Sequence, residues 1–541
     1  MTTPCTARPP APLARAARCL GSGLVIAALA LITGCASLAP GLQGATTAAL
    51  PATTDTALGR LAAAASPDSD LSGFRLMPEG RSAFDTRIQL ARRAQASLDV
   101  QYYQIHNDET GRYLLRTLRD AARRGVRVRV LMDDMYTAGD DELLRGFAAH
   151  PNVELRLYNP FPAGRGRVLT RFLYSLAEFD RVNRRMHNKL FIADGAMAVA
   201  GGRNIGNEYF GRNTDANFID LDTFVTGAIV PRLQHLFDRF WNSPHVLPVQ
   251  AVAPTTLSVP ALQQRFDALT SEASTPSPAP PPPNDPLGYG PMADDLNAGR
   301  LNLVWAPATA YADAPERAIG KTASYNGIPL LDVDSVRYNV MENLRRARSE
   351  VAIASPYLIP GPAGLAVMHE ARQRGVKVSL VTNALAATDE PLVHTGYRRY
   401  RDEMLQAGVE LYELSSNRAR RSVRLGVFGT TIGRLHMKTA VYDRSKLFIG
   451  SMNFDPRSSI HNTEIGLFID SPEMAQQVLK LIDTLKSQGA YTLRLASDGR
   501  RLEWISKDAD GTQVLGEEPD SSFWDRLMLN LLAPMVPESL L

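Results

Sequence analysis

Thiols are nearly absent from this sequence of 541 residues, which has three cysteines, all within the first 35 positions: Cys5, Cys19 and Cys35. The rest of the chain therefore has no thiol that could form a disulfide or ligate a metal ion. Excess charge is also small, with 59 basic and 56 acidic residues. This balance argues against a protein that holds nucleic acid by bulk electrostatic attraction, although it leaves room for a local basic cleft.

The composition is that of a folded protein. Hydrophobic residues make up 45% and charged residues 21% of the chain, and these ordinary globular values argue against wholesale disorder and against a polytopic membrane protein. Because one hydrophobic core rarely grows beyond about 300 residues, we expect two domains of similar size.

The first 34 residues have the pattern of an export signal. Arginines without any acidic residue precede the apolar run 24–34, which is too short to span a bilayer comfortably. The run ends in Ile32-Thr-Gly-Cys35 and resembles a bacterial lipobox, so we predict a lipoprotein signal peptide over 1–34 and lipidation of Cys35. By resemblance to bacterial lipoproteins, Ala36 implies sorting to the outer membrane, and we expect a lipid-anchored protein on the periplasmic face of that membrane in the bacterial cell envelope. A signal-anchor helix with an incidental cysteine is the alternative.

Segments of biased composition divide the remaining chain. Residues 35–58 are rich in Ala, Thr, Pro and Gly and predict a flexible tether. The proline-rich run 274–283 cannot form a helix or a central strand, and it marks a linker or insertion over 251–298. These boundaries leave one unit over 59–250, a second over 299–495 and a C-terminal extension over 496–541. The apolar segment 523–533 of this extension predicts a helix that is either interfacial or docked on the core.

The two units share one order of local patterns. A helix end, a stop glycine and a strand follow one another at 121–131 and again at 371–381. Strand, helix and strand in succession indicate a βαβ crossover. We therefore predict an α/β fold of two duplicated units, each a mixed, mostly parallel β-sheet flanked by helices. A pseudo-twofold axis should relate the units and place the functional site at their interface.

Each unit contains one copy of the pattern H-x-K-x4-D-x6-G-[GS]-x-N. The first copy consists of His187, Lys189, Asp194, Gly202 and Asn204, and the second of His436, Lys438, Asp443, Ser451 and Asn453. The first histidine follows Gly125 by 62 residues and the second follows Gly375 by 61, so the copies are in register with the repeat. The chain has 51 arginines and only eight lysines, yet both copies hold lysine, which indicates that a compact ammonium group is required.

The residue types in the pattern suit an anionic ligand. Residues i and i+2 of a strand face the same way, so the histidine and lysine of each copy should share a face. The glycines allow a close approach of backbone, and Asn204, Asn453 and Ser451 can donate hydrogen bonds to anionic oxygens. Asp215 and Glu464 each lie eleven residues after a motif asparagine, and we predict that they orient the histidines through a ring nitrogen. No His, Cys, Asp and Glu cluster has convincing metal spacing, so we expect neither a metal nor a cofactor.

These motifs resemble the signature of the phospholipase D superfamily over nearly all of the predicted body. Segments 98–103, 131–134 and 183–189 are similar to bacterial cardiolipin synthases of the C type. The resemblance implies that one histidine attacks a phosphodiester phosphorus to give a phosphohistidine and that the other protonates the leaving alcohol. It favours His187 as the nucleophile, although the residues themselves leave the two histidines interchangeable.

The resemblance also implies what the remaining motif residues do. The lysines and asparagines would hold the phosphoryl oxygens. Asp194 and Asp443 complete the two catalytic sets, and we expect them to organise the motifs through hydrogen bonds rather than to transfer protons. Gly202 in the first copy stands where the second copy has Ser451, so one hydroxyl donor is missing from the first unit.

The implied function is a phosphatidyltransferase that acts on membrane phospholipids such as phosphatidylglycerol and phosphatidylethanolamine and makes cardiolipin. The first alternative is a hydrolase that releases phosphatidic acid. The second is a metal-independent nucleic-acid phosphodiesterase, against which the neutral charge and the export signal argue, so no nucleic-acid partner is expected. The third is a non-catalytic envelope lipoprotein, against which two intact motifs argue.

Overall fold

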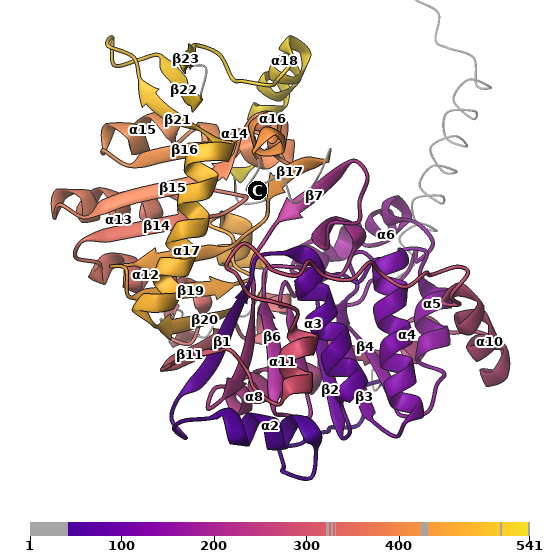
Figure 1. Cartoon of the computed structure of the whole chain (residues 1–541). Coiled ribbons are helices and arrows are strands. Elements are labelled where there is room, and N and C mark those ends of the chain that lie inside the picture. Colours follow the sequence, from indigo (N-terminus) through magenta and orange to yellow (C-terminus); the bar gives the residue numbers. More distant parts are fainter. Residues whose placement is uncertain are drawn as a thin grey trace, which may run out of the picture.

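The computed structural model describes residues 42–320, 324–325, 328–329, 332–422, 431–508, 511–538 and 541. The predicted signal peptide and Cys35 lie outside the described residues. Two α/β units pack against each other, one formed by the first half of the chain and one by the second (Figure 1). The predicted α/β architecture of two duplicated units is therefore confirmed.

Each unit is built around one large sheet. In sheet order, the strands of the first are β10 (Val304–Ala306), β1 (Ser72–Met77), β8 (Asp222–Gly227), β6 (Met197–Gly201), β5 (Leu190–Ala193), β2 (Ser97–Tyr102), β3 (Arg127–Asp133), β4 (Val153–Tyr158) and β9 (Val246–Pro248). Those of the second are β11 (Ala308–Ala312), β20 (Ile465–Asp470), β19 (Lys446–Gly450), β18 (Thr439–Tyr442), β14 (Glu350–Ala354), β15 (Lys377–Asn383), β16 (Glu410–Leu414), β21 (Ala490–Leu495), β22 (Leu502–Asp508) and β23 (Gly511–Leu515). The two orders correspond strand by strand from β1 and β11 onward, as expected for a duplication.

The prediction of mostly parallel sheets is wrong. Parallel pairing is confined to β2, β3 and β4 in the first sheet and to β14, β15 and β16 in the second. The other strand pairs are antiparallel, and among them β5 with β6 and β18 with β19 are joined by a tight turn after each motif. Asp194 and Gly195 have φ of 51° and 63°, and Asp443 and Arg444 have φ of 51° and 55°. Two successive positive φ values form a hairpin turn, which can only join antiparallel strands.

Helices cover the outer face of each sheet. The first sheet carries α3 (Gly80–Arg93), α4 (Glu109–Arg123) and α5 (Asp141–Phe147), and the second carries α12 (Val336–Arg346), α13 (Gly361–Gln373), α14 (Pro391–Arg398) and α15 (Arg401–Gln406). In α4 the side chain of Asp108 accepts a hydrogen bond from the Gly111 amide and caps the helix. The predicted stop glycines Gly125 and Gly375 follow α4 and α13 with φ of 97° and 83°, which only glycine adopts easily.

The two sheets share a core at the interface. This hydrophobic cluster combines residues of both sheets with the buried faces of α8 (Val230–Trp241) and α17 (Pro472–Thr484). Separate clusters lie between each sheet and its outer helices. A further two-stranded sheet joins the units directly, because β7 (Ala216–Ile219) pairs with β17 (Ile432–Leu435). Since the central core belongs to both halves, the relative position of the units is fixed by packing rather than by the linker.

The structure differs from the predicted tether over residues 44–56. This segment lies against the first unit and leads into α2 (Ala57–Ala65). The carbonyl oxygen of Ala45 accepts a hydrogen bond from Arg156, and the Thr47 carbonyl accepts one from Arg129. Both arginines are buried, and a buried guanidinium requires acceptors. The segment is thus held by backbone carbonyls, which its composition does not reveal.

The predicted linker is partly helical. It contains α9 (Val249–Val252), α10 (Val259–Leu269) and α11 (Met292–Ala298), while the proline-rich run has neither helix nor strand, as predicted. From α10 the chain crosses the first unit to α11 (Figure 1). It then forms β10 in the first sheet and β11 in the second, so the units meet at Pro307 rather than at residue 299. The second sheet also continues past residue 495 into β22 and β23.

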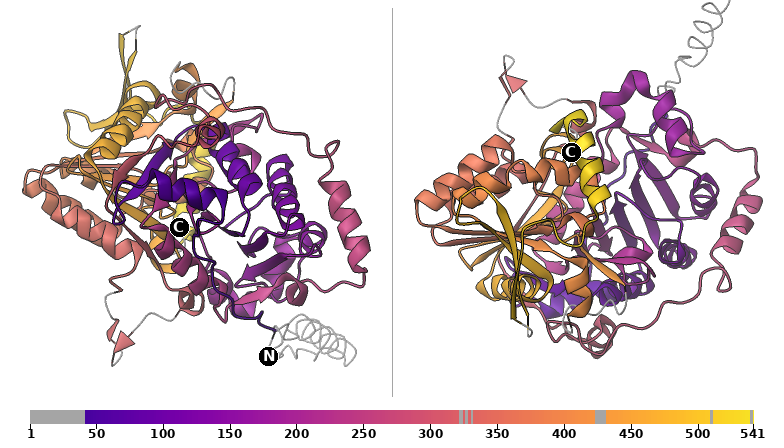
Figure 2. Two further views of the ribbon diagram at one scale, coloured as in Figure 1. Left: turned by 60° about the horizontal axis from the view of Figure 1, so that its bottom comes forward. Right: turned by 90° about the horizontal axis from the view of Figure 1, so that it is seen from above.

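The remaining short elements lie at the periphery. They are α6 (Val168–Tyr174), α7 (Phe179–Val182), α16 (Ser416–Arg421), α18 (Phe523–Leu532) and the hairpin of β12 (Ser324–Tyr325) with β13 (Ile328–Pro329). Figure 2 shows α18 close to the C-terminus on the same edge of the molecule as the short helices of the first unit. Within the described residues, no helix combines the length and the apolar character that crossing a bilayer requires.

Candidate active site

Both histidine-lysine pairs lie just before a strand rather than within one. His187 and Lys189 precede β5, and His436 and Lys438 precede β18. The backbone there is held by the opposite unit. The His187 amide donates to the carbonyl of Thr463 at 2.9 Å, and the His436 amide donates to the carbonyl of Ile219 at 2.8 Å. Each motif is therefore fixed at the interface by the partner half of the chain.

The two units exchange their acidic partners. His187 Nδ1 lies 2.9 Å from an oxygen of Glu464, which belongs to the second unit. His436 Nδ1 lies 2.5 Å from Asp220 Oδ2, which belongs to the first unit. All four side chains are buried. This reciprocal arrangement is the contact pattern expected of a pseudo-twofold interface.

The predicted partner of His436 is therefore wrong. Asp215 is exposed, and its backbone amide bonds to Asn213 on a surface loop before β7. Asp220 lies 16 residues after Asn204, whereas Glu464 lies eleven residues after Asn453. The longer connection in the first unit contains β7. Asp215 and Glu464 therefore have equal spacing in the sequence but do not occupy equivalent positions in the fold. Glu464 was predicted correctly, because the second unit has no strand equivalent to β7 between Asn453 and Glu464.

The lysine ammonium groups lie beside the histidines. Lys189 Nζ donates to the carbonyl of His187 at 2.7 Å, and Lys438 Nζ donates to the carbonyl of His436 at 2.6 Å. Lys438 Nζ also lies 3.0 Å and 3.1 Å from the two ring nitrogens of His436. Burial lowers the pKa of Lys189, and it lowers the pKa of Lys438 to about 8. Two buried cations at one site favour an anionic ligand.

The two histidines share one electrostatic environment. Burial lowers the pKa of His187 far below its usual value, and the neighbouring charges of Lys189, Lys438 and His436 lower it further. Burial also lowers the pKa of His436, with Lys438 acting in the same direction and Asp220 opposing it. Because His187 responds to charges on the second motif, the two motifs form one cluster.

The two carboxyl groups differ in charge state. Burial raises the pKa of Glu464 to about 8. Burial also acts to raise the pKa of Asp220, but the charge and hydrogen bond of His436 outweigh it and the pKa is lowered. Asp220 is therefore a charged partner that stabilises an imidazolium, whereas Glu464 is largely protonated at neutral pH beside a neutral imidazole.

The two motif asparagines have unused polar atoms. Asn204 and Asn453 are both buried, and the Oδ1 atom of each has no hydrogen-bond partner among the described residues. Asn204 Nδ2 donates to the hydroxyl of Tyr209 at 3.0 Å. Buried polar groups in proteins are normally satisfied, so two unsatisfied carboxamide oxygens in equivalent positions mark a place where a polar ligand binds.

Gly202 and Ser451, which we predicted to bind substrate, lie against the acidic residues. The hydroxyl of Ser451 donates to Glu464. A Cβ atom at Gly202 would lie 2.2 Å from Asp220 Oδ1, so only glycine leaves room for this carboxylate. The sequence difference between the two copies thus reflects the different acidic residue beside each position.

Asp194 and Asp443 lie at the opposite end of the motif strands from the histidines. Asp194 accepts hydrogen bonds from the amides of residues 95, 96 and 97 at 2.8 to 3.1 Å. Asp443 accepts from residues 348, 349 and 350 in the same way. Both hold the end of a helix to the hairpin turn, in agreement with the organising role that we expected.

Aromatic side chains wall the site. The ring of Tyr103 lies 5.0 Å from that of His187, and Tyr136 packs edge-on against Tyr103 at 5.4 Å. On the other side, Tyr209 and Phe218 lie 5.2 Å and 4.7 Å from His436. Tyr103 follows β2 directly in the sequence, but the approach of Tyr209 and Phe218 depends on the second unit. Aromatic walls exclude water and strengthen the electrostatic interactions inside.

Asp133 was missed as a positioning residue. It is fully buried at the end of β3 and accepts a hydrogen bond from the Met186 amide at 2.8 Å. Its other oxygen lies 2.9 Å from Arg185. These contacts fix the segment that leads into His187. The place of Asp133 at the carboxyl end of a parallel strand, where α/β sites gather, is the signal that could have identified it.

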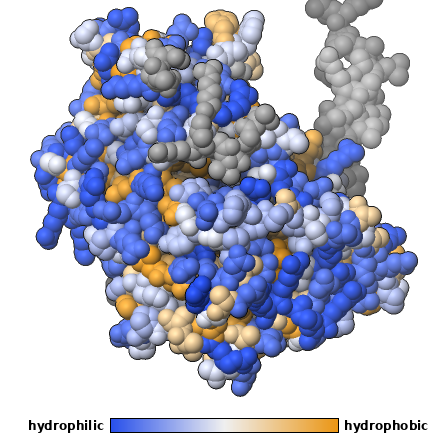
Figure 3. Space-filling model, in the orientation of Figure 1, coloured by the Kyte–Doolittle hydropathy of each residue, from blue (hydrophilic) through white to orange (hydrophobic). Residues whose placement is uncertain are grey.

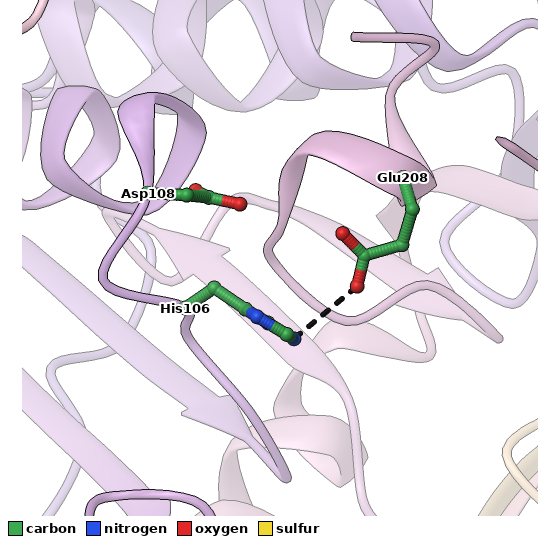
Figure 4. A group of neighbouring side chains, drawn as sticks. All are labelled: His106, Asp108 and Glu208. Atoms are coloured by element: carbon green, nitrogen blue, oxygen red, sulfur yellow. Dashed lines mark ion pairs between the residues drawn. The ribbon is translucent and has the colours of Figure 1, made fainter. Parts of the chain in front are cut away.

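Within the described residues, one group of side chains has the spacing of a metal site. His106, Asp108 and Glu208 face one another outside the motif cluster (Figure 4). His106 Nε2 lies 3.3 Å from Glu208, while Asp108 caps α4 and accepts a hydrogen bond from the Asn207 amide at 2.7 Å. Both oxygens of Asp108 accept hydrogen bonds from backbone amides. Asp108 therefore acts as a helix cap, and His106 and Glu208 form an ion pair beside it.

The fold and the paired motifs define a phosphoryl-transfer enzyme of duplicated α/β units, and comparison with known proteins gives its family. The family model described as "Cardiolipin synthase, PLD-like domain" matches residues 88–241 and 340–486. Cardiolipin synthase C of Escherichia coli K12 is 37% identical over 479 residues, which cover 87% of this chain and 96% of that protein. The chain belongs to the phospholipase D superfamily, and it is a phosphatidyltransferase or phosphodiesterase of that class.

More distant relatives agree. A cardiolipin synthase of Staphylococcus aureus (strain Mu50) is 26% identical over 451 residues, which cover 83% of this chain and 73% of that protein. The crystal structure of a phosphatidylserine synthase from Haemophilus influenzae Rd KW20 matches with a TM-score of 0.55 at 13% identity, over 90% of this chain and all of that chain. At this identity the structural match shows a common fold.

Proposed function

We propose that the protein is a cardiolipin synthase, which transfers a phosphatidyl group between membrane phospholipids through a phosphohistidine. The similarity to Cardiolipin synthase C over nearly the whole of both chains supports this reaction class. The observation that carries the proposal is the pair of buried histidines with exchanged acidic partners at a single interface. Such a site offers one nucleophile and one proton donor to the same phosphodiester.

The charge states assign the two histidines. A nucleophile must be neutral, and burial with the neighbouring cations holds the pKa of His187 well below its usual value beside a largely protonated Glu464. Its Nδ1–H donates to Glu464, which leaves the Nε2 lone pair free to attack the phosphorus. His436 faces the ionised Asp220, which stabilises the imidazolium that protonates the departing alcohol oxygen. This is the assignment that the family resemblance favours.

The remaining groups stabilise the transferred phosphoryl group. As the bond from His187 Nε2 to phosphorus forms and the bond to the leaving oxygen breaks, negative charge is held on the non-bridging oxygens. Lys189 and Lys438 supply positive charge, and Asn204 and Asn453 supply amide donors. In the second half of the reaction, neutral His436 removes the proton from an acceptor hydroxyl, which attacks the phosphorus and releases His187.

Product analysis with defined vesicles tests the reaction. The purified chain is incubated with vesicles of phosphatidylglycerol and phosphatidylethanolamine, and lipids are separated by thin-layer chromatography. We expect cardiolipin from the wild type and none from His187→Ala or His436→Ala. An acid-labile phosphorylated adduct should be absent from His187→Ala. Phosphatidic acid alone would mean hydrolysis, and metal-free nicking of plasmid DNA would mean a nuclease.

We further propose that lipid on Cys35 tethers the enzyme to the periplasmic face of the outer membrane. The lipobox-like sequence and the need to reach membrane substrates support this location. Mass spectrometry of the protein isolated from cells should find Cys35 as an acylated first residue. Replacing it with Ala should leave an unprocessed, unacylated chain, and a wild-type chain that retains residues 1–34 would contradict the proposal.

A further inference from the structure

Large exposed apolar side chains of the described residues gather on two helical segments, one from each unit. The first segment comprises α6, the turn Leu176–Glu178 and the start of α7. Its residues Leu169, Leu173 and Leu176 follow one another at helical spacing and are 70%, 49% and 65% exposed. Tyr174 and Phe179 are exposed beside them. A helical face of this kind normally packs against something apolar.

The second segment is α18. Trp524, Met528 and Leu531 form one face at helical spacing, with exposed fractions of 69%, 52% and 61%. On the opposite side Leu529 is buried, and α18 rests on α14, where Arg398 donates to Asn530. The helix is thus docked on the protein with its apolar face outward, which combines the two alternatives left open by the sequence.

The first segment contacts the loop that carries Tyr136, because Arg171 of α6 donates to the Thr137 hydroxyl at 3.0 Å. Tyr136, which is 43% exposed, packs against Tyr103, and Tyr103 packs against His187. Arg457 of the second unit donates to Asn183, the residue that ends α7. Arg457 also opposes the burial that raises the pKa of Glu390, the residue that immediately precedes α14. Arg457 therefore lies between the end of α7 and the start of α14, the helix against which α18 packs.

One view places the two segments on a common side of the molecule. Seen from above, α18 and the short helices of the first unit lie along the same edge of the molecule (Figure 2). The face drawn in Figure 3 is largely hydrophilic, with only separate hydrophobic areas. Apolar exposure is therefore concentrated on particular segments rather than spread over the surface.

We propose that α6, the start of α7 and α18 form a docking face that inserts shallowly into a phospholipid bilayer and presents the active site to it. The proposal rests on the proposed function, since a phospholipid substrate must leave the bilayer beside the histidines. Trp, Tyr and Phe side chains on these segments are the residues that favour the level of the lipid headgroups. Arg167 beside α6 is exposed and complements anionic headgroups.

Quenching of tryptophan fluorescence by brominated phospholipids measures the contact of the docking face with the bilayer independently of enzyme activity. Of the four tryptophans, Trp524 is the strongly exposed one, whereas Trp241 and Trp504 are buried. With vesicles of phosphatidylglycerol and phosphatidylethanolamine carrying brominated chains, emission of the full chain should fall. The fall should disappear in Trp524→Phe. Equal quenching in both proteins, or none in the wild type, would overturn the docking face.

Serine variants test the consequence for catalysis. Leu169→Ser with Leu173→Ser, and separately Met528→Ser with Leu531→Ser, should lower the transfer rate on vesicles at least tenfold. The rate on monomeric short-chain phosphatidylglycerol and the melting temperature should stay unchanged. A matched control replaces Val259 and Val514 with Ser, since these are exposed apolar residues on α10 and β23, away from the segments; it should behave as wild type.

The outcomes separate the docking face from the proposed function. Absence of transfer on both substrates with normal quenching would refute the proposed function and keep the docking face. A loss of rate that is equal on vesicles and monomers would refute the docking face. If analytical ultracentrifugation shows a dimer that the serine variants dissociate, and no quenching occurs, the segments form a contact between two copies of the chain instead of a membrane contact.

Discussion

Replacing Asp220 with Asn should disable the proton donor while leaving the fold intact. Asp220 Oδ2 lies 2.5 Å from His436 Nδ1, and both side chains are buried. A hydrogen bond to a charged group contributes about 1.5 to 3 kcal/mol. If this energy stabilises the imidazolium in the transition state, its loss at 1.36 kcal/mol per decade of rate lowers kcat by about 10- to 150-fold. The asparagine is of equal size, so KM should change little.

The assay measures transfer from radiolabelled phosphatidylglycerol in mixed micelles over a range of substrate fractions. Asp215→Asn is the matched control, because Asp215 is the exposed aspartate five residues earlier that the spacing argument favoured. It should retain wild-type kcat. If kcat of the Asp220→Asn enzyme is within a factor of three of the wild-type value, or if Asp215→Asn loses as much kcat, the assignment of the acidic partner is refuted.

Three further outcomes follow from the site. Transfer should decline above pH about 8, because Lys438 has a pKa of about 8 and loses its positive charge as the pH rises; Lys438→Arg should move this alkaline decline upward in a pH–rate profile, and an unmoved decline would contradict the cause. Gly202→Ser should reduce kcat as much as Asp220→Asn, since its Cβ would lie 2.2 Å from that carboxylate, while Gly166→Ser, which meets no atom within 4 Å, should be silent. Asp194→Ala should lower the free energy of unfolding by about 3 kcal/mol in urea titration, because three backbone amides lose their acceptor; a change below about 1 kcal/mol would show that water replaces it.

Local patterns were sufficient for the elements that depend on neighbours in the sequence. The stop glycines Gly125 and Gly375 have positive φ values and lie between a helix and the following strand, as predicted from their position. The proline-rich run has no regular structure. Asp194-Gly195 is a strong hairpin signal that was available in the sequence, and reading it would have corrected the expectation of parallel sheets.

Contacts between distant residues could not be obtained in this way. The segment 44–56 lies on the first unit because Arg129 and Arg156 need acceptors, and nothing in its own composition indicates this. Ser451 bonds to Glu464 rather than to a substrate oxygen. The Oδ1 atoms of Asn204 and Asn453 are unsatisfied because the fold buries them where no described protein donor reaches them.

The sequence by itself determined the two candidate sets of reacting groups. His187 and Lys189 are two residues apart, as are His436 and Lys438, in two copies of one motif. Residues so close in the sequence stay close together however the two units pack. The tertiary structure alone decided which carboxylate serves which histidine. Those pairs join residues 277 and 216 positions apart, and each crosses from one unit to the other, so packing of the shared core and not the order of residues along the chain brings them together.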